Sequence, residues 1–308
     1  MADAGLEWAR CMQRGDYESA WEISDAVLAS RGRCSPTIPR HQQWLWDGTP
    51  LDDRHVLIHC YHGLGDTLQF IRYAPLVARR ARKVSVWAQR ALLPLLRTVR
   101  GIHELLPLHE GDPGIARDLD VEIMELPHIF RTTRSTVPAQ VPYIDARPRA
   151  GVRVDGCNVG IVWAAGDWDS RRSIPFAEIE CLAAIPGVRL HILQRGRAAA
   201  AVRNGWGLPS GSDEIPMTAA TMRALDLVIS IDSMPAHLAG ALGVPVWTLL
   251  HDDHDWRWPA EGSITPWYPT MRLIRQRTPG RWTEVIEEVV SRLRIHASCW
   301  KPCHDGRP

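Results

Sequence analysis

The chain has 308 residues, of which 45% are hydrophobic and 23% are charged, and its formal net charge is +1. The length allows two domains in a soluble globular protein, and the near-neutral charge argues against a nucleic acid or an anionic membrane as the main partner. No apolar run reaches the roughly 18 residues of a membrane span, no signal peptide is evident, and the 7 cysteines are scattered; we therefore expect a cytoplasmic protein with reduced thiols.

Two short helices are predicted within residues 5–31, separated by Gly15 and Asp16. Their spacing matches one tetratricopeptide-like unit. Because a single unit cannot bury its own apolar face, we expect it to dock on the rest of the protein or on a partner. Residues 32–52 are rich in proline and polar groups, which indicates a linker.

From His55 onward, predicted strands and helices alternate, which indicates βαβ units and parallel sheets. The predicted strands are 56–60, 84–88, 121–124, 159–164, 189–194, 227–231 and 244–250, and the predicted helices are 67–82, 91–99, 176–184, 218–224 and 282–293, with another helix after Asp232. A proline-rich connector at 138–148 separates the two sets. The predicted fold is α/β, with two βα domains in tandem and a cleft between them.

The predicted strand 227–231 ends at Asp232 and Ser233, and a helix of small residues starts at once. Ser233 suits the N-cap of this helix and Pro235 suits its first turn. Free N–H groups and the positive dipole end at such a helix start favour a phosphate, and α/β sheets bind ligands at this edge. We expect a diphosphate there, and an ordinary structural turn is the alternative.

A glycine-containing loop, His62 to Leu68, follows the first predicted strand and opens a helix. It is not a dinucleotide fingerprint, because Leu68 takes the place of the third glycine and no acidic residue ends the second strand at 87–89. Asp66 is either a helix N-cap or a general base facing the cleft. Arg72, one turn further on, belongs either to a solvated helix face or to the cleft.

The run Gly63 to Tyr73 resembles the first motif of the ADP-heptose:lipopolysaccharide heptosyltransferase family, glycosyltransferase family 9. Asp232 to Gly243 is similar to that family's donor motif Asp-Thr/Ser-x-x-x-His-Leu-Ala, and Arg171 to Pro175 resembles its basic-then-proline segment. The branch fused to tetratricopeptide repeats matches best, on the N-terminal helices and on residues 46–51, 255–258 and 266–273. The resemblance covers about residues 5–295.

This resemblance implies a GT-B fold, in which two Rossmann-like βαβ domains face a cleft. It also implies inverting, metal-independent transfer of a heptose-like sugar from an ADP-linked or other nucleotide diphosphate donor to an acceptor hydroxyl. It implies a general base at Asp66 and a contact of Asp232 with the donor sugar. The other implied donor-binding residues are Arg171, Arg172, Ser233, Met234, Pro235, His237, Gln194, Met217 and Trp163, and the acceptor side comprises His62, Gly63, Gly65 and Arg72. Tyr61 and His62 stand where the repeat-fused branch usually has an acid and Gln, so the resemblance does not determine the identity of the acceptor.

The predicted organisation is a helical segment with linker at 1–50, an acceptor domain at 51–148, a donor domain at 149–295 and a tail at 296–308. We expect no cofactor and no required metal, since no Asp-x-Asp element ends a strand. Two clusters contain residue types that bind metals, so a metal site is an alternative interpretation for each: the loop His251 to Asp255 and the pair Cys299 and Cys303. A solvated loop and a disordered tail are the respective alternatives.

Two other functions fit the same residues. One is a nucleotide-sugar-binding protein without catalysis, whose N-terminal helices recruit a partner, and the other is an NDP-sugar epimerase of similar fold. The donor sugar and base, the oligomeric state and the acceptor (a saccharide, a protein side chain or a small molecule) are not fixed by the sequence. The 14 tryptophans serve either as core or as sugar-binding rings.

Overall fold

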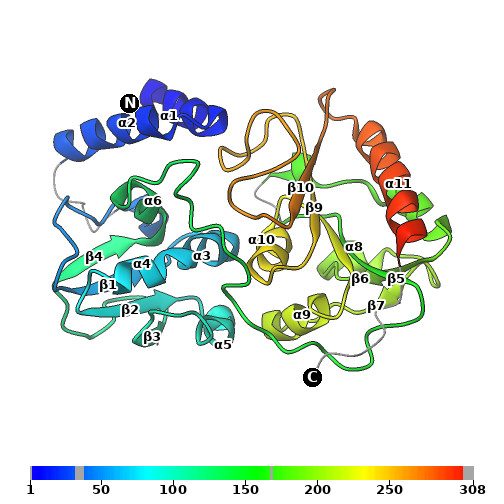
Figure 1. Ribbon diagram of the computed structural model, residues 1–308, viewed down its shortest axis with the longest axis horizontal. Helices are drawn as coiled ribbons and strands as arrows, with labels where there is room; N and C mark the ends of the chain where they lie inside the picture. The colour runs from blue at the N-terminus through cyan, green and yellow to red at the C-terminus, as the bar shows by residue number, and fades with distance from the viewer. Residues whose placement is uncertain (1, 32–37, 167–168, 301–308) are drawn as a thin grey trace. The chain divides into compact units, whose positions relative to one another are not determined.

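The computed structural model describes residues 2–31, 38–166 and 169–300 (Figure 1). The chain forms two compact units. Unit 1 comprises residues 1–145, 241–243 and 255–269, and unit 2 comprises residues 146–240, 244–254 and 270–308. Each unit is built around its own parallel sheet, so the predicted α/β class with two parallel sheets is confirmed.

The sheet of unit 1 has four strands in the order β3-β2-β1-β4. Its strands are β1 (His55–His59), β2 (Lys83–Ala88), β3 (Glu104–Pro107) and β4 (Leu119–Glu122). Strand β1 pairs in parallel with β2 and β4, so that Val56 lies opposite both Val84 and Leu119. All residues of β1 are buried, as expected for a central parallel strand covered on both faces.

The helices of unit 1 are α1 (Ala2–Arg14), α2 (Tyr17–Ser30), α3 (Leu64–Phe70), α4 (Ala74–Ala78), α5 (Leu93–Leu96) and α6 (Leu126–Ile129). The helix predicted at 67–82 is broken, because a 3₁₀ turn at Ile71–Tyr73 separates α3 from α4. Pro75 lies in the first turn of α4, where its missing N–H is tolerated. The paired helices α1 and α2 (blue in Figure 1) pack against the rest of unit 1, where Trp21 Nε1 donates to the Thr132 carbonyl at 2.7 Å.

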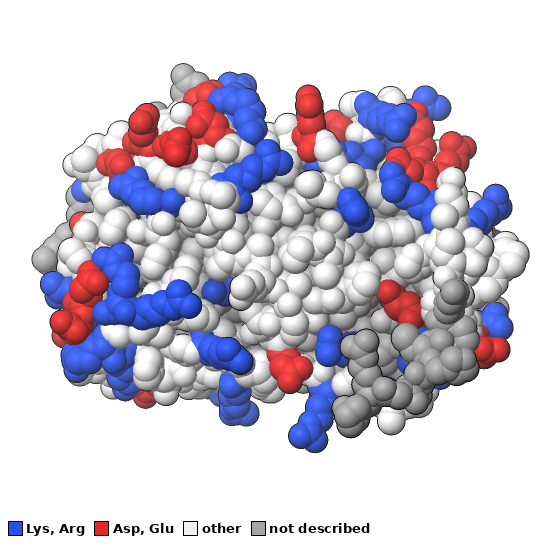
Figure 2. All heavy atoms as spheres, in the orientation of Figure 1, with Lys and Arg blue, Asp and Glu red and all other residues white. Residues whose placement is uncertain are grey.

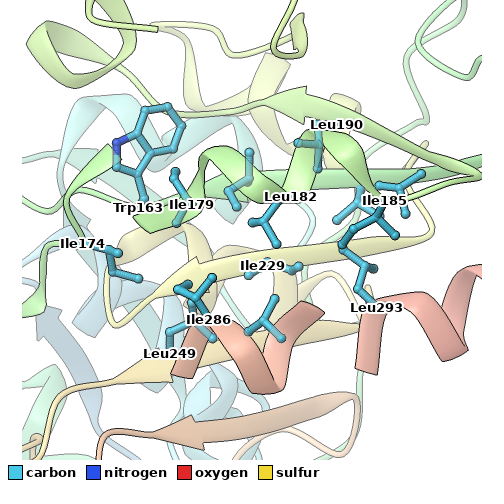
Figure 3. Close-up of a cluster of buried hydrophobic side chains, with 14 of the residues drawn as sticks. Trp163, Ile174, Ile179, Leu182, Ile185, Leu190, Ile229, Leu249, Ile286 and Leu293 are labelled. Carbon is cyan, nitrogen blue, oxygen red and sulfur yellow. The ribbon is translucent and has the colours of Figure 1, made fainter. Parts of the chain in front are cut away.

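The sheet of unit 2 has six strands in the order β10-β9-β8-β5-β6-β7. They are β5 (Cys157–Val162), β6 (Val188–Ile192), β7 (Leu208–Pro209), β8 (Leu227–Ile231), β9 (Val246–Leu250) and β10 (Met271–Arg275). The helices are α7 (Phe176–Ile179), α8 (Gly196–Ala200), α9 (Ile215–Met222), α10 (Met234–Ala241) and α11 (Trp282–Cys299). In the core, Ile286 and Leu293 of α11 lie with Ile229 of β8 and Leu249 of β9 in one buried cluster (Figure 3).

Both sheets reverse their strand order once, between β1 and β4 in unit 1 and between β5 and β8 in unit 2. Open α/β sheets bind ligands outside the carboxyl ends of the strands at such a reversal, because the neighbouring connections leave in opposite directions there. The residues that follow these four strands are therefore the first place to look for a site in each unit.

Within the described ranges, no helix is both long and apolar enough to cross a membrane. On the face drawn in Figure 2, acidic and basic side chains are interspersed, in keeping with a net charge of +1.

Candidate functional site

Asp66 lies at the carboxyl edge of the sheet in unit 1. Strand β1 ends at His59, and α3 starts after Gly63, which occupies the N-cap position. The sequence alternative that made Asp66 the N-cap is wrong, because Asp66 is the third residue of α3 and its Oδ2 accepts the Gly63 N–H at 2.8 Å. An acid at the third helical position can accept a hydrogen bond from the backbone N–H of the N-cap residue, which stabilises the first turn of the helix.

The same carboxylate is held by Arg257. Nη2 of Arg257 donates to Asp66 Oδ1, Nε donates to Gln69 Oε1 at 3.0 Å, and Nη1 donates to Asp255 Oδ1 at 2.8 Å. The Arg257 side chain is 10% exposed and that of Asp66 is 22% exposed. The guanidinium therefore fixes the direction of the carboxylate while leaving it accessible. Sequence reasoning missed this role and noted Arg257 only as part of a family match.

A buried acid, Glu122, ends β4 beside this loop. Its Oε2 lies 3.7 Å from His62 Nε2 and accepts the Met124 N–H at 2.7 Å. Burial, reinforced by the negative charges of Glu125 and Asp66, raises the pKa of Glu122 to about 8. Burial also lowers the pKa of His62. Sequence reasoning missed Glu122 as well, although its position at the end of a strand next to β1 was a usable signal.

Arg72 is an internal support of unit 1 and is only 3% exposed. Its Nε donates to the Gln69 carbonyl at 2.7 Å, its Nη2 donates to the Tyr143 hydroxyl at 2.8 Å, and its Nη1 donates to the Trp267 carbonyl. The guanidinium also lies 4.3 Å from the ring centre of Tyr268. Arg72 lies neither on a solvated face nor in an open cleft, the two predicted positions. Its guanidinium is buried, where it contacts aromatic rings and donates hydrogen bonds to protein oxygens.

In unit 2, Arg172 links the segments that follow β5 and β8, the two strands between which the strand order reverses. It follows β5 in the chain, and its Nη1 donates to the Asp232 carbonyl, just after β8, at 3.0 Å. Its Nε is buried and has no hydrogen-bond partner among the described residues. The guanidinium thus lies near the start of α10, where the helix dipole is positive. Two positive ends side by side are unfavourable unless an anion joins them.

The other predicted residues of this turn surround the helix start. Asp232 is buried, Ser233 Oγ donates to the Ile231 carbonyl at 3.2 Å, and Met234 and Pro235 form the half-buried first turn of α10. His237 is 5% exposed on the next turn of the helix.

Arg171 is engaged differently from Arg172. Its Nε and Nη2 donate to Asp169 at 3.0 and 2.9 Å, and its Nη1 donates to Asp253 at 2.9 Å. These carboxylates raise the pKa of Arg171, and Arg171 in turn lowers that of Asp169. His251 Nε2 lies 3.7 Å from Asp169 Oδ2. The positive charge of Arg171 is therefore already balanced by the carboxylates of Asp169 and Asp253. Arg172, by contrast, donates its hydrogen bond to a backbone carbonyl.

Across the described part of the chain, no group of three or more His, Cys, Asp or Glu side chains is placed to hold a metal ion. Cys303, one of the two cysteines of the predicted tail pair, lies outside the described residues.

Gln194 and Trp163 stabilise the strand ends of unit 2. Gln194 Oε1 accepts the N–H groups of Trp163 and Ala164 at 2.9 and 2.8 Å, and its Nε2 donates to the carbonyls of Ala164 and Arg195 at 3.2 and 3.1 Å. The indole of Trp163 is 2% exposed and lies in the buried cluster of Figure 3, against Phe176. Met217 is 37% exposed on α9.

No family model matches the sequence. The protein FlbA of Caulobacter vibrioides is 25% identical in an alignment 347 positions long, gaps included, which covers 96% of this chain and 56% of FlbA. The chain thus spans about half the length of this curated relative.

Solved structures are more informative about the fold. The structure of Escherichia coli ADP-heptose LPS heptosyltransferase II matches with a TM-score of 0.58 at 14% identity, over 78% of this chain and 98% of that chain. The family 9 glycosyltransferase of Veillonella parvula matches with a TM-score of 0.56 at 11% identity, over 74% and 87% of the two chains. This chain has the fold of the family 9 heptosyltransferases. TibC of enterotoxigenic E. coli, an iron-containing dodecameric glycosyltransferase, also matches, with a TM-score of 0.54 at 16% identity over 84% and 71% of the chains.

Within this family 9 fold, most of the predicted residues fall into three groups. His62, Gly63, Gly65 and Asp66 lie together after β1, and Arg172, Asp232, Ser233, Met234 and Pro235 lie together after β5 and β8. Arg72, Trp163 and Gln194 are used inside the protein. The resemblance inferred from the motifs is thereby confirmed for the fold, and the fusion to tetratricopeptide repeats stays a prediction.

Proposed function

We propose that this protein is an inverting glycosyltransferase, which moves a sugar from a nucleoside diphosphate donor to an acceptor hydroxyl. ADP-heptose is the donor we favour, since the names of the structural neighbours include an ADP-heptose heptosyltransferase. In this proposal unit 2 holds the donor and unit 1 supplies the general base.

The observation that carries the proposal is the pairing of Arg172 with the start of α10. Arg172 keeps a buried, unpartnered N–H beside a positive helix end. A diphosphate would satisfy both groups, because it accepts charge-assisted hydrogen bonds from the guanidinium and from the free N–H groups of the helix. No neutral ligand would offset the two positive ends in this way.

The proposed reaction is a single displacement. The acceptor oxygen forms a bond to the anomeric carbon while the bond from that carbon to the diphosphate oxygen breaks, and ADP leaves with the electron pair. Asp66 receives the proton of the acceptor hydroxyl. Its carboxylate has about four lone-pair directions, of which the Gly63 N–H and Arg257 each occupy one, so acceptor sites remain.

Charge on the leaving diphosphate is stabilised in this proposal by Arg172 and by α10. Preorganised donors of this kind contribute about 3 kcal/mol each to transition-state stabilisation. The proposal therefore includes no metal, although TibC is described as iron-containing.

The decisive test is the substitution Asp66→Ala. We expect the release of ADP from ADP-heptose, with water as the surrogate acceptor, to fall by about 10²- to 10⁴-fold, since a positioned general base contributes that much. Calorimetric binding of ADP should stay within about twofold of the wild type. Asp52→Ala, which removes an exposed carboxylate paired with Arg80 in the same unit, is the matched control.

The reverse result is expected for Arg172→Ala, which should weaken ADP binding by about tenfold or more, because a charge-assisted hydrogen bond is lost. Full turnover in Asp66→Ala would remove Asp66 from the mechanism. A wild-type protein that binds ADP but never releases it from ADP-heptose would instead indicate a binding protein without catalysis.

A further inference from the structure

Two of the places where the N-terminal helices α1 and α2 contact the rest of unit 1 differ in what they hold. At the first place, α2 is anchored to the segment after α6. Asp25 accepts hydrogen bonds from both Nη atoms of Arg131 at 2.7 and 2.8 Å and lies 2.9 Å from His128 Nε2. Trp21 adds its hydrogen bond to Thr132. This anchor involves no residue of the Asp66 site.

At the second place, α1 holds the segment that carries Arg257. The Gln13 carbonyl, near the C-terminal end of α1, accepts the Ala260 N–H at 2.9 Å. The ring of Trp8 meets the ring of Trp256 edge-on at 4.8 Å, and Trp8 Nε1 donates to Ser24 of α2 at 3.1 Å.

Trp256 passes this contact on to Arg257. The Arg257 guanidinium lies 4.6 Å from the ring centre of Trp256 and 5.6 Å from that of Phe70. Phe70 stacks on Trp256 at 6.1 Å and belongs to α3, the same helix as Asp66. The guanidinium is therefore held between aromatic rings while its N–H groups bind Asp66, Gln69 and Asp255.

We propose that the N-terminal helix pair positions the general base: Trp8 fixes Trp256, Trp256 fixes Arg257, and Arg257 orients the Asp66 carboxylate. This inference rests on the proposed function, in which Asp66 takes the acceptor proton. It gives α1 a role inside the protein, where the sequence suggested only docking or the recruitment of a partner. Trp8, Trp256 and Arg257 are positioning residues, since none of them needs to touch the substrate.

The kinetic test combines two substitutions. Trp8→Ala should lower kcat for ADP release from ADP-heptose about tenfold with KM unchanged, and Arg257→Gln should lower kcat about 100-fold, because small displacements of a catalytic group are costly. If Trp8 acts through Arg257, the double variant will be no slower than Arg257→Gln alone. Independent, multiplying losses in the double variant would overturn the proposal.

Two controls separate positioning from general stability. Asp25→Ala loosens the same helix pair at its other anchor and should lower thermal stability while kcat stays at the wild-type value. Trp8→Phe keeps an aromatic edge against Trp256 and should restore most of the lost kcat. If Asp25→Ala lowers kcat as much as Trp8→Ala does, the helices act only through stability and the proposal fails.

A second readout does not depend on turnover. The Gly63 N–H is bound by Asp66, so its hydrogen exchange reports how firmly the carboxylate is held. We expect exchange at Gly63 to become about tenfold faster in Trp8→Ala and to be unchanged in Asp25→Ala. Unchanged exchange in Trp8→Ala would overturn the positioning role. Absence of ADP release by the wild-type protein would instead contradict the proposed function.

Discussion

Glu122 is a carboxylic acid beside the Asp66 loop whose pKa is strongly raised. Its ordinary pKa of 4.5 is raised to about 8, chiefly by burial and further by the negative charges of Glu125 and Asp66, and the His62 ring lies 3.7 Å from it. The folded state therefore binds a proton between pH 4.5 and pH 8 that the unfolded state has released. The stabilising contribution is complete below the unfolded pKa and is lost as the pH rises through the folded pKa.

Glu122→Gln should flatten this dependence, because glutamine stays neutral and its carbonyl can still accept the Met124 N–H. We expect the wild-type protein to lose on the order of 1 kcal/mol of stability per pH unit from this group between pH 5 and pH 8, and the variant to lose none of that contribution. Thermal unfolding across this range measures the difference, with the exposed Glu261→Gln as control. Equally steep curves for the variant and the wild type would show that Glu122 does not hold the proton.

At the residue scale, the sequence predicts Asp66 as a candidate base, since a strand, a glycine loop and a family motif converge on it, and this role stays a prediction. It could not identify Arg257, which lies 191 residues further along the chain. No local pattern connects the two, and their contact depends on tertiary packing. Arg72 was misplaced for a related reason: the helix breaks at Ile71, so a single helical period does not determine which way Arg72 points.

At the scale of elements, Gln194 ties the end of β5 to the segment after β6 with all its polar atoms engaged. Gln194→Ala would leave the N–H groups of Trp163 and Ala164 without their acceptor. We expect a loss of about 2 kcal/mol or more in the free energy of unfolding, measured with urea. The affinity for ADP should change less than in Arg172→Ala, because Gln194 has no polar atom left for a ligand.

Gln42→Ala, an exposed glutamine in unit 1, is the control for this measurement. A Gln194→Ala protein with wild-type stability but a lost affinity for ADP would restore Gln194 as a nucleotide ligand.

The alternation of strands and helices in the sequence predicts most strands of the two sheets, and it gives β8 its observed bounds. The strands it missed, β3, β7 and β10, all lie at sheet edges. An edge strand has a neighbour on one side only and needs no continuous apolar run, so its sequence carries a weaker signal. Strand β3 ends in Pro107 and β7 has 2 residues, which weakens the signal further.

At the scale of the whole molecule, the two units should respond differently to ADP. Because the proposed diphosphate anchors all belong to unit 2, ADP should slow hydrogen exchange in residues 232–240 and 169–174. Helix α3 of unit 1 should change much less. Exchange followed by mass spectrometry, with and without saturating ADP, measures this, since a bound ligand suppresses local opening. Protection confined to α3 would contradict the assignment of the donor to unit 2.

The predicted domain boundaries divide the chain into consecutive blocks, whereas the compact units interleave along it. Residues 255–269 are compact with unit 1 although they follow β9 of unit 2 in the chain. Their periodicity and composition do not mark them as different from their neighbours. What assigns them is the burial of Trp258, Trp267 and Tyr268 and the contacts of Arg257, and these become visible only in three dimensions.

This interleaving matters while the protein is being made. Residues 1–145 leave the ribosome before unit 2, and the segment 255–269 that completes unit 1 emerges only after more than a hundred further residues. At about 5–20 residues per second, the nascent chain waits roughly 6–25 s before Trp256 and Trp267 can cover Phe70. Until then Phe70, Trp8 and Tyr17, the rings that Trp256 and Trp267 contact, form an exposed apolar surface on the growing polypeptide, where chaperones that bind unfinished chains would act.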